Sequence, residues 1–306
     1  MSNDGSESEP LLAYGRLLSR PVTSFILDEV ARITARCNGD LLMALVELAL
    51  IQASRPTGET GPKAQRAVSA RAIGLSLGLS YETCRRKVLE LEGTGRCVRV
   101  SASRLRMSPD YLDSPAYLAD CEDKWRNLRG YFVELRETGF DLNMFSSISP
   151  QNAVVAPSRS MAINALIDDY LLRMQEARIA DEEEAFNSLV NSAVSNMNGD
   201  PLRFDRDLNW KYAGVDAAPP DSARRPVTIA AVARRVKVSE DIIRGRINMY
   251  VQRGWIRRVR GGYLHVMDKQ LTPEAHKSRN TMNLRFFQLV KALRLLGVDP
   301  QTVTAD

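Results

Sequence analysis

Histidine is nearly absent from this chain, and its scarcity excludes most familiar catalytic arrangements. Only His265 and His276 occur among 306 residues. No Ser-His-acid order, HExxH zinc motif, GxxxxGK[ST] phosphate loop or GxGxxG dinucleotide loop is present. Paired carboxylates such as Asp168 and Asp169 are typical of charged helix surfaces. We therefore expect a protein that is not an enzyme, with no metal and no cofactor.

Cysteine is also sparse, and its spacing excludes a disulfide framework or a zinc site. Cys37, Cys84, Cys97 and Cys121 lie far apart and form no CxxC pair. We expect reduced, mostly buried thiols. A redox sensor at Cys84 is the alternative, because the two arginines that follow it could lower the pKa of its thiol.

Long apolar runs are missing as well. No stretch of about 18 apolar residues is present, so no transmembrane helix is expected, and the acidic start MSNDGSESEP lacks the pattern of a signal peptide. We predict a disordered tail over residues 1–19 and a cytoplasmic protein. With 44% hydrophobic residues, the chain can bury a core, and its length suggests about two domains.

The positive charge is unevenly distributed. The net charge is +5, and the segment from Arg225 to Arg260 holds ten Lys or Arg against only two acids, Glu240 and Asp241. A local excess of this kind favours an anionic partner.

The stretch LGLSYETCRRKVLELEGTGRCVRV, residues 77–100, has the pattern of a capped helix followed by a hairpin. Ser80 is a good N-cap, Cys84, Val88 and Leu91 share one helical face, and Gly95 follows the helix. CVRV and RLRM then alternate apolar and polar residues around SAS, as a short β-hairpin does. A shorter helix capped by Ser69 precedes them. The order predicts a helix-turn-helix over 69–93 and a wing over 96–107.

These residues resemble the winged helix-turn-helix of bacterial transcription regulators, and most closely the GntR and Crp families. Ser80, Thr83, Cys84 and Arg85 stand where recognition helices of those families begin with a Ser-x-x-Thr-Val-Arg phrase. The resemblance covers about 45 residues, and nothing outside it matches the ligand domains of those families. It implies binding to double-stranded DNA and a role in transcription regulation.

A second copy of the pattern follows 159 residues later. Residues 66–107 align without a gap on 225–266, with nine of 42 positions identical, among them Ser80/Ser239, Arg85/Arg244 and Gly95/Gly254. A shift of 141 also relates 25–52 to 166–193. We therefore predict a mainly α fold with small β-wings, in which two winged helix-turn-helix modules in tandem are related by internal duplication.

The predicted organisation follows from this repeat. The second module would hold a helix-turn-helix over 228–252 and a wing over 255–267. The polar loop before this helix-turn-helix is longer than the corresponding loop of the first module. The full division is a tail over 1–19, a first helical and winged-helix module over 20–141, a linker over 142–160, a second module over 161–299 and a tail over 300–306.

A recognition helix enters the major groove with its first residues toward the bases, and arginines on a wing suit phosphate or the minor groove. We predict double-stranded DNA as the partner, in the cytoplasm at the nucleoid; a homodimer or a partner in the transcription machinery stays open. The alternatives are a plasmid or phage replication initiator with tandem winged helices and a protein-interaction scaffold. The predicted DNA-binding residues are Ser80, Tyr81, Glu82, Arg85, Arg86, Arg99, Arg104, Ser239, Glu240, Asp241, Arg244, Arg246, Arg258 and Arg260.

Overall fold

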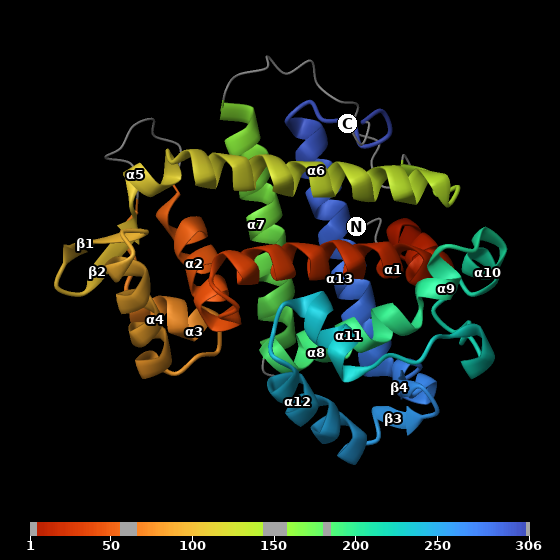
Figure 1. Ribbon diagram of the computed structural model, residues 1–306. Helices are drawn as coiled ribbons and strands as arrows, with labels where there is room; N and C mark the ends of the chain where they lie inside the picture. Colours follow the sequence, from red (N-terminus) through yellow and green to blue (C-terminus); the bar gives the residue numbers. More distant parts are fainter. Residues whose placement is uncertain (1–4, 56–65, 143–157, 180–184, 304–306) are drawn as a thin grey trace. The chain divides into compact units, whose positions relative to one another are not determined.

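The chain is mostly helical, with two small two-stranded antiparallel sheets (Figure 1). The structure, a computed structural model, describes residues 5–55, 66–142, 158–179 and 185–303. It divides into two compact units. Each unit is named here for its β-hairpin, which is called its wing: residues 97–107 in the first and 256–265 in the second. The N-terminal wing unit comprises Arg32–Arg126 and Val154–Ala185, and the C-terminal wing unit comprises Met1–Ala31, Asn127–Ala153 and Phe186–Asp306.

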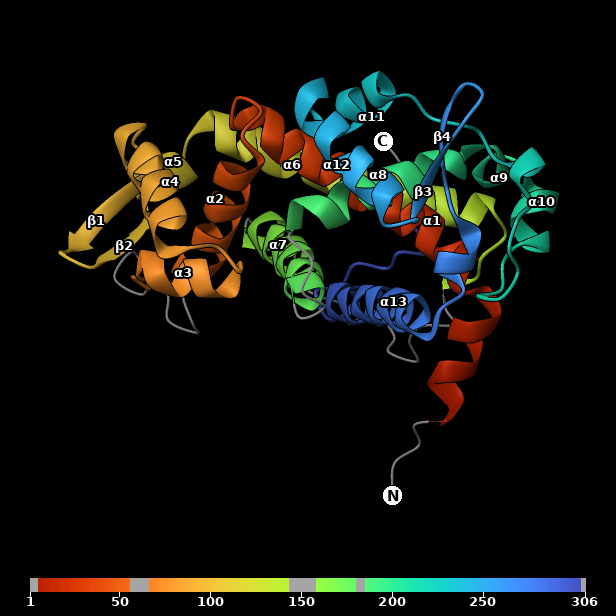
Figure 2. The same ribbon diagram turned by 90° about the horizontal axis from the view of Figure 1, so that it is seen from below.

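The elements of the N-terminal wing unit follow the order predicted from the sequence. Leu45, Val46 and Leu50 of α2 are among its buried residues, and the β1–β2 hairpin lies beside α4 in both views (Figures 1 and 2). Its elements are the end of α1 (Gly5–Arg36), α2 (Leu41–Ser54), α3 (Ala70–Ser76), α4 (Tyr81–Gly93), β1 (Cys97–Ser101), β2 (Arg104–Met107), α5 (Pro109–Leu112), the first half of α6 (Pro115–Glu137) and α7 (Ser158–Ile179).

The predicted caps determine where α3 and α4 begin. The Ser69 hydroxyl accepts a hydrogen bond from the Ala72 amide at 3.2 Å, and the Ser80 hydroxyl accepts one from the Thr83 amide at 3.1 Å. Between the helices Gly78 takes a left-handed conformation with φ of 61°, which glycine adopts without a steric penalty. This turn directs the two apolar helix faces toward one core.

The C-terminal wing unit contains the same local sequence of elements. Thr228 caps α11, and Lys237 stands in the left-handed turn with φ of 57°, 159 residues after Gly78. Its elements are the first part of α1, the second half of α6, α8 (Ala185–Asn198), α9 (Asp200–Arg203), α10 (Arg206–Lys211), the 3-10 turn η3 (Asp221–Ala223), α11 (Ile229–Val236), α12 (Glu240–Gln252), β3 (Ile256–Val259), β4 (Gly262–His265), η4 (Met267–Gln270) and α13 (Pro273–Leu295).

Each hairpin gains an isolated bridge from the segment before its helix pair. Val68 exchanges backbone hydrogen bonds of 2.8 and 2.9 Å with Leu105, and Val227 exchanges bonds of 3.0 and 2.9 Å with Tyr263. The bridge ties the strand end of each wing to the start of its helix pair. The hairpins are therefore positioned by backbone bonding as well as by packing.

Aromatic side chains form the core of the C-terminal wing unit. Tyr131 of α6 lies between Phe25 of α1 and Phe286 of α13, with ring centroids 5.8 and 5.0 Å away. Trp210 of α10 donates its indole N–H to the Thr138 carbonyl at 2.7 Å. The long polar loop predicted before the second helix-turn-helix thus contains short, anchored helices.

The prediction of a disordered tail over residues 1–19 is wrong. Helix α1 begins at Gly5, and Leu17 and Leu18 are almost fully buried. The Arg16 amide also donates to the Ala213 carbonyl at 2.8 Å, so a contact far along the chain orders this segment. The compact units are interleaved along the chain, whereas the predicted module boundaries were consecutive. The described residues do not include the loop over 56–65, most of the linker over 142–160 or residues 304–306.

Candidate nucleic-acid interface

Helix α4 presents a polar face to solvent because its apolar residues recur at helical spacing on the other side. Cys84, Val88 and Leu91 are buried, whereas the predicted readers on the first turns of the helix are exposed. Tyr81 keeps 55% of its surface accessible. The exposed predicted residues are Ser80, Tyr81, Glu82, Arg85 and Arg86.

Arg85 is held by its own helix. Its guanidinium donates two hydrogen bonds of 3.0 Å to the two carboxylate oxygens of Glu82. This hydrogen bonding raises the pKa of Arg85 and lowers the pKa of Glu82. Arg86, by contrast, has no ion pair or hydrogen bond with any described residue, and its guanidinium is open to solvent.

Helix α12 has a related but weaker arrangement. Ile243, Ile247 and Tyr250 are buried, and a guanidinium nitrogen of Arg244 lies 3.9 Å from a carboxylate oxygen of Glu240. Ser239 stands at the N-cap position without a side-chain capping bond. The exposed predicted residues here are Ser239, Glu240, Asp241 and Arg244.

Two basic residues point inward instead. Lys87 of α4 is 8% exposed and pairs with Asp40, the N-cap of α2. Arg246, which stands 159 residues later on α12, donates to the Asn187 side chain at 3.0 Å and lies 5.4 Å from the Phe186 ring centroid. These contacts join α4 to the N-cap of α2 and α12 to α8, so Arg246 serves packing within its unit in the free protein.

The wing arginines differ in how firmly they are held. Arg99 pairs with Glu92 at 2.8 Å, and Arg104 donates to the Ala67 carbonyl at 2.9 Å. Arg258 and Arg260 are exposed, and no ion pair or hydrogen bond joins either side chain to another described residue. The second wing therefore offers the freer cations.

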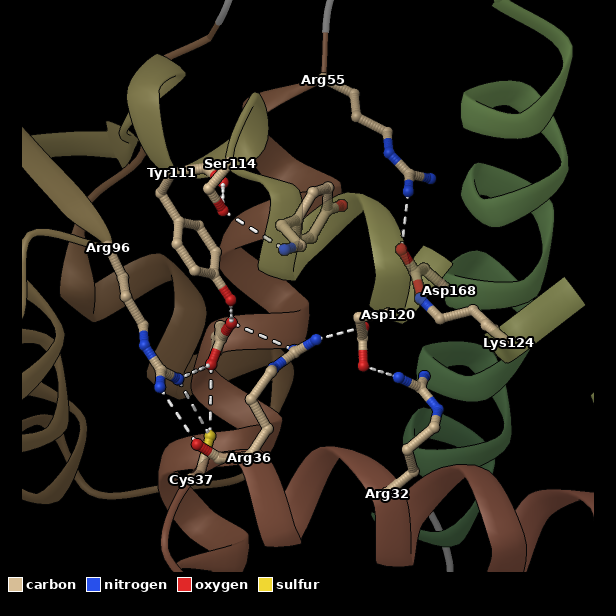
Figure 3. Close-up of polar contacts among 12 residues, drawn as sticks. Arg32, Arg36, Cys37, Arg55, Arg96, Tyr111, Ser114, Asp120, Lys124 and Asp168 are labelled. Carbon is tan, nitrogen blue, oxygen red and sulfur yellow. Dashed lines mark hydrogen bonds and ion pairs between the residues drawn. The ribbon is translucent and has the colours of Figure 1, made fainter. Parts of the chain in front are cut away.

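A buried carboxylate fixes the base of the first wing, and Figure 3 labels its partners Arg36, Cys37, Arg96 and Tyr111. Glu47 of α2 is fully buried and accepts from Arg96 at 2.7 Å, from Tyr111 at 2.6 Å and from Cys37 at 3.2 Å, while Arg36 lies 3.1 Å away. Burial alone would raise the pKa of Glu47, but the arginines and the tyrosine hydroxyl outweigh it and the net pKa is lowered. Arg96, at the start of the wing, is thereby anchored to α2.

Asp168 is a second buried carboxylate in the same unit, and the interpretation of Asp168 and Asp169 as surface charges is wrong for the first of them. Asp168 is fully buried and pairs with Lys124 and with Arg55, the latter at 2.6 Å (Figure 3). Asp169 remains partly exposed and pairs with Arg173. No local sequence pattern indicates this difference, because Arg55 and Lys124 lie 113 and 44 residues away from Asp168.

The four cysteines are buried and free, as expected. Burial raises the pKa of the Cys84 thiol to about 11, so the neighbouring arginines do not lower it. Arg85 and Arg86 extend from the exposed face, whereas Cys84 faces the core. Cys84 is therefore a protonated core thiol at neutral pH.

Comparisons with models of protein families, with curated proteins and with solved structures find no match. Among the described residues, no group of three or more His, Cys, Asp or Glu side chains could hold a metal ion. No single described helix has the length and apolar character to cross a membrane; the bent pair Tyr14–Arg36 and Leu41–Ser54 reaches both only when taken together.

Proposed function

We propose that the chain is a sequence-specific double-stranded DNA-binding transcription regulator, built from two winged helix-turn-helix modules related by internal duplication. One shift of 159 residues relates the local structure of the two units. It relates the buried positions Cys84, Val88 and Leu91 to Ile243, Ile247 and Tyr250, the N-cap Ser80 to Ser239, and the left-handed turn residue Gly78 to Lys237.

The observation that carries the proposal is the placement of Arg85 and Arg244. They occupy corresponding positions of α4 and α12, and both side chains are about half exposed, at 48% and 54%. An arginine near the start of a helix that enters the major groove can donate two hydrogen bonds to one guanine. The cations two positions further on, Lys87 and Arg246, contact Asp40 and Asn187 within their own units, so Arg85 and Arg244 are the corresponding cations that both helices present to solvent.

Glutamate in the first turn suits the same role. Glu82 and Glu240 each lie next to the reading arginine, and a glutamate can accept from cytosine N4. When a base replaces the intrahelical partner, the pair can exchange its mutual bonds for bonds to the base edges. After the exchange the arginine and the glutamate still have hydrogen-bond partners. The helix would be selective for base pairs that offer an acceptor to the arginine and a donor to the glutamate.

The two modules would read different half-sites. Gly245 stands opposite Arg86, so α12 lacks one cation that α4 presents. Two modules tethered in one chain raise their effective concentration for each other's half-site, so affinity increases without new contacts. We therefore expect a two-part, imperfectly symmetric site.

The test is selection of binding sites from a random duplex library with the full chain, followed by titration of the selected duplex at several salt concentrations. The proposal predicts a two-part motif and an affinity that decreases with salt as phosphate contacts are screened. A library that yields no motif, together with weak binding to all duplexes, would contradict it.

Replication initiation is the alternative within DNA binding. The same selected motif, mapped on the genome of the source organism, separates the two functions. Sites at promoters support regulation, whereas clustered repeats at one origin support initiation. A scaffold role is the outcome if no duplex is bound.

A further inference from the structure

Four arginines of the C-terminal wing unit, two of them buried and two partly exposed, form a group here named the arginine cluster: Arg16 of α1, Arg20 of α1, Arg224 after η3 and Arg279 of α13. Arg16 is 5% exposed and Arg224 is 8% exposed. Arg16 and Arg279 converge on one residue, since Arg16 donates to the Gln270 side chain at 3.0 Å and Arg279 to the Gln270 carbonyl at 3.2 Å.

The groups that satisfy these arginines are mostly neutral. Arg16 also donates to the Val215 carbonyl at 3.0 Å, and Arg20 donates to the Tyr212 carbonyl at 2.7 Å. Carbonyl oxygens satisfy donors but do not neutralise charge. Among the described residues, no carboxylate lies within ion-pair distance of Arg16, Arg20 or Arg279.

Two carboxylates lie nearby, and neither balances the cluster. Asp221 pairs with Arg224, but it is shared with Arg257. Asp216 is exposed to 85% of its side chain and lies 3.7 Å from His276. Neither carboxylate therefore forms an ion pair with Arg16, Arg20 or Arg279.

Burial acts on all of these cations, and repulsion by other arginines of the cluster adds to it at Arg16 and Arg20. Burial, followed by the charges of Arg279 and Arg20, lowers the pKa of Arg16 to about 9. Burial likewise lowers the pKa values of Arg20 and Arg279 to about 10. All three groups stay protonated at neutral pH, so the positive charge is present and uncompensated, which is costly in an interior.

The cluster also has unused donors. Among the described residues, the Arg16 Nη2, Arg279 Nη1 and Arg224 Nε nitrogens are buried without a hydrogen-bond partner. Buried donors without partners are rare in folded proteins and call for an unseen water or ion. Guanidinium groups are well suited to a tetrahedral oxyanion, because their forked donors match its oxygens.

We propose that the arginine cluster is a binding site for a small oxyanion of the phosphate class, either inorganic phosphate or the phosphate group of a small effector. Arg16 and Arg224 are only 5% and 8% exposed, which favours a small ligand over a duplex. Binding would neutralise the cluster and link α1, η4 and α13. The inference does not depend on DNA binding.

The test is thermal unfolding of the full chain with increasing inorganic phosphate, compared with sodium chloride at equal ionic strength. At a phosphate concentration about 100 times Kd, the expected rise in Tm is about 5 °C beyond the chloride control. Arg279→Gln and Arg16→Gln remove a cluster donor and should abolish the rise. Arg253→Gln removes the same charge from the exposed C-cap position of α12, which is not among the predicted DNA-binding residues, and should keep the rise.

Equal shifts in phosphate and chloride would overturn the proposal, and so would a phosphate-dependent rise that persists in Arg279→Gln. Arg279 is less buried than Arg16, so it supplies the decisive variant if Arg16→Gln does not fold. Duplex binding measured in the same series identifies the source of the anion. If Arg279→Gln weakens duplex binding and free phosphate competes with the duplex, the site holds a DNA phosphate and the small-ligand assignment is wrong.

Discussion

Arg85 donates to both carboxylate oxygens of Glu82 at 3.0 Å, so the arginine proposed to read DNA is engaged by its own helix in the free protein. An exposed pair of this kind contributes little to stability. It holds the guanidinium in one orientation and places a negative charge beside it. Binding to DNA must exchange this pair for contacts to bases and phosphates.

Replacement of Glu82 should therefore strengthen binding to any duplex. In Glu82→Gln, Arg85 loses its partner and one negative charge leaves the interface. The dependence of log K on log salt for a random duplex should steepen by up to about 0.9, the contribution of one further phosphate contact. Glu137→Gln, an exposed substitution at the end of α6, is the charge-matched control and should leave the slope unchanged. Weaker random-duplex binding in Glu82→Gln would show that the pair is not released in the complex.

The two arginines on α12 should separate binding from stability. Arg246→Ala removes a hydrogen bond to Asn187 and the contact with the Phe186 ring, and it should lower the free energy of unfolding by about 1–2 kcal/mol. Arg244→Ala should change it by less than about 0.5 kcal/mol. Urea denaturation of both variants measures this. Equal losses of stability would mean that Arg246 is not a packing residue.

Glu47 should contribute strongly to the stability of the N-terminal wing unit. Glu47→Gln leaves Arg36 and Arg96 without their buried partner and should cost about 3–5 kcal/mol at neutral pH. Because the folded pKa of Glu47 is lowered, its contribution is complete above the unfolded value of about 4.3 and is lost as pH falls through the folded value. The stabilities of the wild type and variant should thus converge in acid. A difference that is constant with pH would contradict the ion-pair account.

His265 predicts a separate pH dependence in the C-terminal wing unit. Burial, aided by Arg224, Arg16 and Arg279 and opposed by its bond to Val266, lowers the pKa of His265 to about 4. The unfolded chain therefore binds the proton first, and stability should fall by about 3 kcal/mol as pH decreases from 6.5 to 4.

Denaturation of wild type and His265→Gln at several pH values tests this expectation. The variant should lose most of the slope in that window. The Glu47 contribution is lost only below about pH 4.3, so the pH dependences due to His265 and to Glu47 can be measured separately. A variant that keeps the full slope between pH 6.5 and 4 would assign the transition to other groups.

Local patterns in the sequence predicted local structure well. The caps at Ser69 and Ser80 and the glycine stop at Gly95 act through neighbouring backbone groups, so the starts and ends of these helices could be predicted. The alternation of the strands and the helical spacing of Cys84, Val88 and Leu91 likewise depend on nearby residues.

Contacts between distant residues could not be predicted in the same way. Residues 1–19 look polar at the start, yet Leu17 and Leu18 are buried in a unit completed by residues beyond 186. Asp168 has partners far along the chain, and Arg246 meets Asn187, 59 residues before it. Helical spacing predicted that Arg246 lies on this helix, but it could not predict that the Arg246 side chain contacts α8.

The most direct test of the central claim is the affinity of the wild type, Arg85→Ala and Arg244→Ala for the selected duplex and for duplexes with one half-site altered. The account predicts that each substitution costs about 1–3 kcal/mol on the selected duplex and relaxes preference in one half only. Arg258→Ala should weaken binding to all duplexes alike, as loss of a phosphate contact does. If both α4 and α12 variants bind every duplex as the wild type does, these helices do not read DNA.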